Sequence, residues 1–410
     1  MLTRRSALSV MIGIGAAAWL STAAVGQEGE PIKVGEINSY SALPAFTEPY
    51  RKGWQLAVEQ INESGGVLGR PLEVISRDDG GKPGNAVTIA EELLSREKVD
   101  LLAGTFFSHI GLAVSDFALQ KQVVFLASEP LTDALVWEKG NRYTFRLRPS
   151  TYMQSAMLAR EAAASKAKRW AFVAPNYKYG QDAVAAFKKL LKEQNPEVEF
   201  VGEQWPALRK IDAGATVRAL EAAKPDGIFN VLFGADLAEF VREGNLRGLF
   251  KDRTVVGLLT GEPEYLLPLG EEAPRGWIVT GYPWYDIQDP AHKKFVADYQ
   301  ARWDEDPMTG SLVGFNTILS IKAAIEAAGS TKTELLVQAF RGLSVETPIG
   351  TIIYRKVDHQ STMGAWVGIT RWREGGGYMT GWRYVPGQDV LPSTEVADEM
   401  RPDDSVDSVK

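Results

Sequence analysis

Apolar residues follow two alternating patterns along most of the chain. Short runs rich in β-branched and aromatic residues are separated by longer stretches with the three-to-four-residue period of an amphipathic helix. The short runs predict strands buried on both faces, and the alternation predicts parallel sheets covered by helices, an α/β fold. The expected strands are Ile32–Ile37, Leu72–Ser76, Asp100–Ala103, Val123–Ala127, Trp170–Ala174, Glu197–Val201, Gly227–Leu232, Val255–Leu259 and Gly276–Gly281. The expected helices include Trp54–Asn62, Asn85–Arg96, Asp182–Gln194 and Ala235–Leu246.

The last third of the chain has a different order of elements. Three helical stretches are expected first, at His292–Trp303, Leu312–Ala328 and Thr333–Phe340. Three strands then follow, at Gly350–Tyr354, Trp366–Trp372 and Tyr378–Val385. A chain of 410 residues is long enough for about two domains. Residues 389–410 are acidic and poor in bulky apolar side chains, so a disordered tail is expected there.

Composition excludes several classes of function. A net charge of −7 disfavours a nucleic-acid surface, because phosphate binding needs concentrated positive charge. The sequence has no cysteine, which excludes disulfides, thiolate catalysis and Cys-based zinc sites. The three histidines are scattered, and neither a Gly-x-Ser-x-Gly motif nor a Walker loop occurs, so no metal, cofactor or bond-making chemistry is expected.

Residues 1–26 are predicted to be a signal peptide. Arg4 and Arg5 form a basic start, and the apolar run 7–20 is too short to span a bilayer comfortably. Small residues at 24–26 suit a signal peptidase. The paired arginines also resemble a twin-arginine signal, so general secretion and the twin-arginine route both stay open. Either route predicts a periplasmic protein.

The segment from Ile61 to Gly104 has a distinctive sequence motif. It reads Gly-Gly-Val-x-Gly-Arg-x-Leu-x-Val, then an acidic pair, a proline, an Ala-rich helix and Val-Asp-Leu-Leu-Ala-Gly. This motif closely resembles the first lobe of the leucine/isoleucine/valine-binding protein family, the solute receptors of bacterial ABC importers. The resemblance extends over Ile32–Val385. It is strongest at 53–131 and again at 177–180, with weaker matches at 222–226 and 244–248.

The resemblance implies a type I periplasmic-binding-protein fold, with two Rossmann-like lobes of parallel strands and a cleft and hinge between them. Lobe 1 would comprise residues 31–147 plus 282–349, and lobe 2 residues 148–281 plus 350–388. The strand Tyr143–Arg148 would leave the first lobe, and the chain would return to it near Gly281. Ligands of such sheets bind at the carboxyl ends of the strands.

Ser108 is the first candidate contact, at the start of a helix that follows a buried strand. A serine there can cap the helix by accepting a backbone N–H bond. The same helix terminus offers free N–H groups and partial positive charge to a carboxylate. In the family, the residue aligned with Ser108 binds the ligand carboxylate, which favours a binding role. His109 is expected to add a hydrogen bond or charge.

Two phenylalanines of the first lobe are further candidates. The family places an aromatic or polar contact at Phe46, in the loop after the first strand, with core packing as the alternative. Phe106 and Phe107 cannot both face the cleft, because side chains alternate along a strand, and Phe107 is taken as the contact.

The segment Ala127-Ser-Glu-Pro-Leu131 ends another strand of the first lobe. Family members present backbone and hydroxyl groups there, so Glu129 and Leu131 are departures. Glu129 is either an exposed loop carboxylate or an acidic group in the binding site.

The second lobe supplies three aromatic candidates. Tyr177 and Tyr179 lie between a strand and a helix, where tyrosines cover the ligand in relatives of this family. Phe233 matches a ligand-facing aromatic position, with packing at the strand end as the alternative.

The strand ending at Leu259 bears on the kind of ligand. Amino-acid receptors of the family usually have a carboxylate near this point to pair with the ligand ammonium, but the sequence reads Leu258-Leu259-Thr260, with Glu262 downstream. A buried ammonium without a partner costs several kcal/mol. Either Glu262 or Glu129 supplies the partner, or the ligand has no ammonium. The many aromatic candidates favour the second option, an apolar aromatic carboxylate that also contacts Leu259.

The expected function is that of a monomeric periplasmic solute-binding protein. It would close its cleft on a small carboxylate and deliver it to ABC transporter permease subunits, with no enzymatic activity and no nucleic-acid partner. A branched-chain or other amino-acid receptor of the same transporter class is one alternative. A periplasmic sensor for a receptor kinase is another. A hydrolase is disfavoured, because no nucleophile motif is present.

Overall fold

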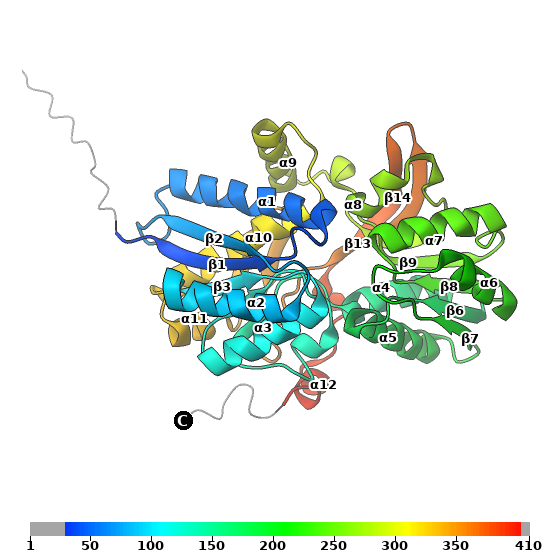
Figure 1. Ribbon diagram of the computed structural model, residues 1–410, viewed down its shortest axis with the longest axis horizontal. Coiled ribbons are helices and arrows are strands. Elements are labelled where there is room, and N and C mark those ends of the chain that lie inside the picture. The colour runs from blue at the N-terminus through cyan, green and yellow to red at the C-terminus, as the bar shows by residue number, and fades with distance from the viewer. Residues whose placement is uncertain (1–28, 403–410) are drawn as a thin grey trace, which may run out of the picture.

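Two β-sheets divide the protein into two lobes (Figure 1). The computed structural model describes residues 29–402, so the predicted signal peptide lies outside the described residues. Helices cover both faces of each main sheet, as the alternating pattern predicts for an α/β protein.

Lobe 1 contains a five-stranded parallel sheet in the order β2-β1-β3-β4-β5. Its strands are β1 (Ile32–Asn38), β2 (Leu72–Asp78), β3 (Leu101–Gly104), β4 (Phe125–Ala127) and β5 (Thr144–Arg146). Its helices are α1 (Pro44–Glu63), α2 (Pro83–Glu92), η1 (Leu93–Glu97), α3 (Ser108–Lys121), η2 (Asp133–Leu135), α9 (Pro290–Trp303), α10 (Thr309–Ala328) and α11 (Thr333–Phe340).

Lobe 2 contains a seven-stranded sheet in the order β14-β13-β10-β9-β8-β6-β7. Five strands are parallel, and a long antiparallel hairpin closes one edge. The strands are β6 (Arg169–Val173), β7 (Glu199–Gln204), β8 (Gly227–Asn230), β9 (Thr254–Gly261), β10 (Ile278–Gly281), β13 (Ala365–Arg373) and β14 (Gly376–Val385). The helices are α4 (Thr151–Ala164), α5 (Lys178–Gln194), α6 (Ala213–Ala223), α7 (Gly234–Arg247), α8 (Pro263–Leu266) and η3 (Leu267–Glu272).

The chain passes between the lobes after β5, after β10 through η4 (Trp284–Asp286), and before β13. The last of these passages lies later than predicted. The hairpin of β11 (Ser344–Thr347) and β12 (Gly350–Ile353) leads into Tyr354, whose hydroxyl donates to Ser320 Oγ of α10 at 2.9 Å. His359 stacks on Phe145 of β5 with ring centroids 4.1 Å apart. Residues 350–361 therefore pack on lobe 1, because a strand pattern does not indicate which sheet a strand joins.

The helices α1 and α10 bring distant parts of lobe 1 into close contact. A Cβ atom on Gly314 would lie 2.1 Å from Tyr50 O, so the glycine lets the two backbones approach. By length and composition α10 resembles a membrane-spanning helix, but 67% of its apolar window is buried inside the protein, as in the core helix of a soluble domain.

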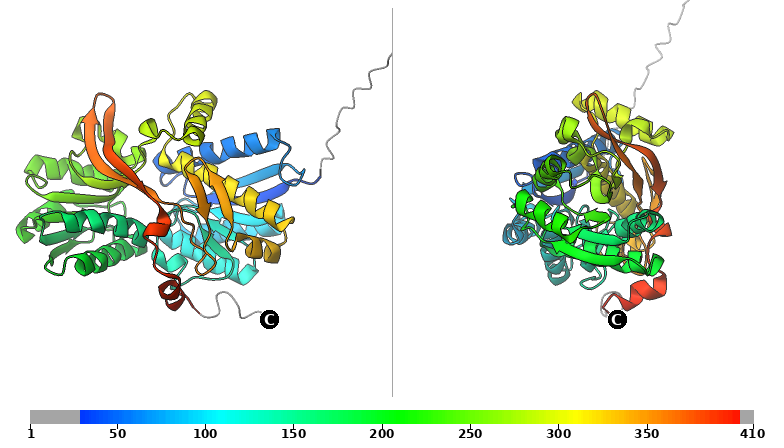
Figure 2. Two further views of the ribbon diagram at one scale, coloured as in Figure 1. Left: turned by 180° about the vertical axis from the view of Figure 1, so that it is seen from behind. Right: turned by 90° about the vertical axis from the view of Figure 1, so that its right-hand side faces the viewer.

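The segment after β14 is ordered through residue 402, contrary to the disordered tail that we predicted for residues 389–410. It forms η5 (Gly387–Asp389) and α12 (Thr394–Glu399), which lie below the junction of the lobes (Figure 2). Asp389 O accepts from Arg160 of lobe 2 at 2.8 Å, and Arg401 donates to Val136 O of lobe 1 at 2.6 Å. Backbone carbonyls of distant segments hold this tail, and its own composition does not reveal them. Residues 403–410 lie outside the described part of the chain.

Candidate functional site

A cavity lies between the two lobes at the carboxyl ends of their strands. With the lobes in this arrangement its volume is small, about 10 Å³. The lining combines aromatic rings with two charged side chains, and consists of Phe106, Ser108, Glu129, Leu131, Arg148, Tyr177, Tyr179, Phe233 and Leu259. Seven of the ten residues predicted from the sequence are among these nine.

The end of β3 forms part of the lobe 1 wall. Gly104 and Thr105 both have positive φ angles, 105° and 49°, so the chain turns sharply before Phe106. Helix α3 begins at Ser108, so the N-cap residue is Phe107 and not Ser108, and the helix has no side-chain capping bond. Instead, Ser108 Oγ accepts the N–H of Thr132 at 3.2 Å, which leaves the Ser108 hydroxyl proton for another acceptor. The cavity therefore lies next to a helix N-terminus, where backbone N–H groups favour an anion.

Glu129 follows β4 and is a cavity residue, not an exposed loop carboxylate, because 1% of its surface is accessible. Its Oε1 accepts from Asn38 Nδ2 at 3.1 Å. Its Oε2 is buried without a hydrogen-bond partner in residues 29–402. Burial raises the pKa of Glu129 well above its usual value, although Asn38 and Arg148 favour the charged form.

Arg148 lies where the chain leaves lobe 1, and it is the cation of the cavity lining. It is 4% exposed and its Nη2 is ion-paired with Glu262 of lobe 2. Its guanidinium carbon lies 5.2 Å from the ring centroid of Phe46. Arginine has five N–H donors in a planar fork, so the pair with Glu262 leaves donors for a second carboxylate.

The lobe 2 wall is aromatic. The ring centroids of Tyr179 and Phe233 are 5.7 Å apart, as are those of Tyr177 and Tyr179. Leu259 has a φ of 65°, which is uncommon for a residue other than glycine. Strained backbone of this kind is often found at ligand sites.

Three of the predicted residues, Phe46, Phe107 and His109, do not line the cavity. Phe46 is the third residue of α1 and not a loop residue, because Pro44 occupies the first helical position, where proline is favoured. It packs on Phe106, with centroids 5.0 Å apart. Phe107 precedes α3 and is buried, while His109 lies between Phe107 and Tyr177. Burial lowers the pKa of His109, so a cationic contact from it is disfavoured.

The sequence reasoning missed Phe106 and Arg148. For the phenylalanine pair, Phe107 was chosen on the assumption that strand alternation extends to these residues, but β3 ends at Gly104 and Phe106 is the one that lines the cavity. Arg148 could have been found as a basic residue before Pro149, at the end of the strand that was predicted to leave lobe 1.

The lobes contact each other around the cavity. Phe106 and Phe233 face each other across it, with ring centroids 6.1 Å apart. On one side, Gly310 at the start of α10 donates its N–H to Glu264 Oε1 of lobe 2 at 2.6 Å. On the other, Asp133 of lobe 1 donates its N–H to Asp182 Oδ2 of lobe 2 at 3.1 Å. The arrangement is therefore closed, and a ligand enters only when the lobes separate.

The cavity chemistry suits reversible binding. Burial raises the pKa values of Glu262 and Glu264, and Arg148 favours the charged form of Glu262. Among the described residues, no group of three His, Asp or Glu side chains forms a metal site.

Comparisons with known proteins agree with this architecture. The family model described as periplasmic binding protein matches residues 31–377. A leucine-, isoleucine-, valine-, threonine- and alanine-binding protein of Pseudomonas aeruginosa is 26% identical over 75% of this chain and 81% of the relative.

Two solved structures from Rhodopseudomonas palustris have the same fold. One, an ABC transporter solute-binding protein in complex with 3,4-dihydroxybenzoic acid, aligns with a TM-score of 0.79 and 23% identity, over 87% of this chain and 98% of that one. The other, in complex with 4-hydroxybenzoate, aligns with a TM-score of 0.77 and 21% identity, over 87% and 96%. The chain thus belongs to the leucine/isoleucine/valine-binding family of type I periplasmic binding proteins, the solute-binding proteins of ABC transporters.

Proposed function

We propose that this solute-binding protein captures a small, apolar aromatic carboxylate between its lobes and delivers it to the permease of an ABC transporter. The carrying observation is Arg148, a buried cation with spare donors in a lining that is otherwise mostly aromatic. Arginine binds carboxylates through two parallel N–H bonds. Ser108 and the N-terminus of α3 would hold the same carboxylate from lobe 1.

The aromatic lining supports a ring as the body of the ligand. Phe106 belongs to lobe 1, whereas Tyr179 and Phe233 belong to lobe 2. A flat ring between them would contact both lobes and so stabilise the closed form. Closure then follows as a population shift, because the ligand binds the closed form better than the open one. The aromatic acids bound to the two Rhodopseudomonas palustris proteins are consistent with this proposal.

A branched-chain amino acid is the second candidate. The free oxygen of Glu129 favours it, because an ionised carboxylate there could pair with an ammonium group. The curated relative that binds leucine, isoleucine and valine is consistent with this alternative.

A titration of the purified, ligand-stripped protein separates the two candidates. We expect benzoate and hydroxybenzoates to bind in isothermal calorimetry and to raise the melting temperature, whereas leucine, valine and phenylalanine do not. A ligand at 100 times its Kd stabilises the protein by about 2.7 kcal/mol. Stabilisation by leucine or valine without any effect of the aromatic acids would refute the proposal.

A further inference from the structure

Glu129 has an unsatisfied oxygen in the wall of the ligand cavity. The side chain is 1% exposed, and Oε2 has no hydrogen-bond partner within the described chain. Leaving a buried polar atom unpaired costs about 1–3 kcal/mol. Such a group needs an explanation, and a missing ligand atom is a direct one.

Asn38 fixes which oxygen of Glu129 stays free. The Oδ1 atom of Asn38 accepts the backbone N–H of Ser39 at 2.8 Å. The NH₂ group of Asn38 must therefore face Glu129, where it donates to Oε1 at 3.1 Å. Because the amide cannot flip without losing both bonds, Oε1 is occupied and Oε2 remains for another partner.

Neighbouring side chains are already engaged. The hydroxyl of Ser128 bonds with Tyr50 and with Thr317, at 3.0 Å in each case. Arg148 is ion-paired with Glu262, and no ion pair joins it to Glu129 in the part of the chain that the structure describes. The two charged groups of the lining are thus separate, and Glu129 Oε2 is left without a partner in a residue that lines the cavity.

We propose that Glu129 selects aromatic carboxylates that carry a hydroxyl group on the ring. This inference rests on the proposed function. The ligand carboxylate binds Arg148, and its ring hydroxyl hydrogen-bonds to Glu129 Oε2. An ionised Glu129 accepts the hydroxyl proton, whereas a protonated Glu129 donates to the hydroxyl oxygen, so both forms recognise the same group.

The experiment compares affinities for benzoate, 3-hydroxybenzoate and 4-hydroxybenzoate by calorimetry. We expect wild-type protein to bind at least one hydroxybenzoate about 10- to 100-fold more tightly than benzoate, as one hydrogen bond to a charged group provides. The apolar variant Glu129→Met, of similar length, should lower this ratio to about one and retain benzoate binding. Glu129→Gln, which keeps hydrogen-bonding atoms, should give an intermediate ratio.

The matched control is Glu239→Met, which removes an exposed carboxylate from α7. It should leave the ratio at the wild-type value. Melting temperatures check that each variant is folded, because Glu129→Met also removes the partner of Asn38.

Each outcome decides the inference. A wild-type ratio near one would overturn the role of Glu129, and so would a ratio that Glu129→Met does not change. In both cases benzoate binding would still support the proposed function. Leucine binding that Glu129→Met abolishes would show that Glu129 binds an ammonium group instead. If neither benzoate nor a hydroxybenzoate binds, the proposed function fails and this inference fails with it.

Discussion

Arg146 and Arg148 are two residues apart and both buried, at 0% and 4% exposure, but they lie in different surroundings. β5 ends at Arg146, and the chain then turns into the passage between the lobes. Arg146 Nε donates to Gln360 at 2.5 Å and Nη1 donates to Thr132 O, while Asp133 and Asp358 supply negative charge. Arg148 pairs with Glu262 on one edge and borders the cavity on the other.

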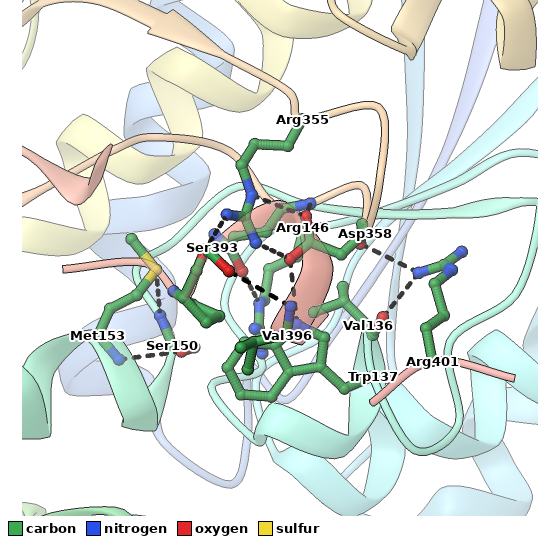
Figure 3. Close-up of polar contacts among 12 residues, drawn as sticks. Val136, Trp137, Arg146, Ser150, Met153, Arg355, Asp358, Ser393, Val396 and Arg401 are labelled. Atoms are coloured by element: carbon green, nitrogen blue, oxygen red, sulfur yellow. Dashed lines mark hydrogen bonds and ion pairs between the residues drawn. The ribbon is translucent and has the colours of Figure 1, made fainter. Parts of the chain in front are cut away.

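The two arginines differ in the groups that surround them. Around Arg146 the neighbouring groups all belong to the protein, although its Nη2 has no hydrogen-bond partner among the described residues. Figure 3 shows the neighbouring Asp358, which accepts from Trp137 Nε1 and Arg355 Nε at 3.0 Å each. Arg148 differs in its place, because it borders the cavity between the lobes. A buried arginine enclosed by protein groups stabilises one arrangement, whereas one that borders a cavity can also contact a ligand.

The largest expected effect follows from removing Arg146. Arg146→Met removes the positive charge that acts on the buried Asp133, which costs about 3–5 kcal/mol of unfolding free energy. Urea unfolding measures this loss. Ligand affinity of the remaining folded protein should change less than threefold, and a large loss of affinity with unchanged stability would contradict the assignment.

Removing Arg148 should affect binding first. Arg148→Met is expected to weaken binding of an aromatic carboxylate about 100-fold or more, because a buried, hydrogen-bonded charge pair is lost. Calorimetry provides the measurement. The double variant Arg148→Met with Glu262→Gln removes the stranded carboxylate, so it should recover stability without recovering affinity.

The ordered C-terminal segment gives a smaller effect on stability. Arg401 donates to the carbonyls of Val136, Asn141 and Asp358 at 2.6, 2.7 and 3.0 Å. Arg401→Ala should lower the unfolding free energy by about 2 kcal/mol, because it leaves buried carbonyls unsatisfied. A melting temperature equal to that of wild type would show that the segment contributes little in solution.

Glu264 should give the smallest effect, and one that depends on pH. Burial raises the pKa of its carboxyl above the usual 4.5, so the folded protein retains a proton that the unfolded chain releases. Stability from this group therefore falls as the pH rises above 4.5. Glu264→Gln stays neutral, so its stability relative to wild type should increase as the pH rises from about 5 to about 8, and melting temperatures of both proteins measured across this range test the change. A pH-independent difference would argue against the shift.

The fold could be predicted from the sequence because it depends on repeated local patterns. The predicted strand Val255–Leu259, for example, is an apolar run, and it lies buried within β9 (Thr254–Gly261). The patterns did not show where residues 350–361 pack, because that depends on contacts of Tyr354 and His359 with residues far away in the chain.

The residues that line the cavity could be predicted where they lie at the end of a strand or the start of a helix. Ser108, Tyr179 and Phe233 occupy such positions and line the cavity. Phe46 was placed in a loop because Pro44 and Pro49 concealed the start of α1. Arg148 was missed because a buried arginine needs a partner, and its partner, Glu262, is more than a hundred residues away.

The C-terminal segment has a mechanical consequence. It starts from β14 in lobe 2, touches Arg160 there, and ends on lobe 1 at Val136 and Asn141. The two lobes are therefore joined by this segment as well as by the three passages of the chain. A change in the angle between the lobes must be accommodated either along the segment or by release of its contacts with one lobe.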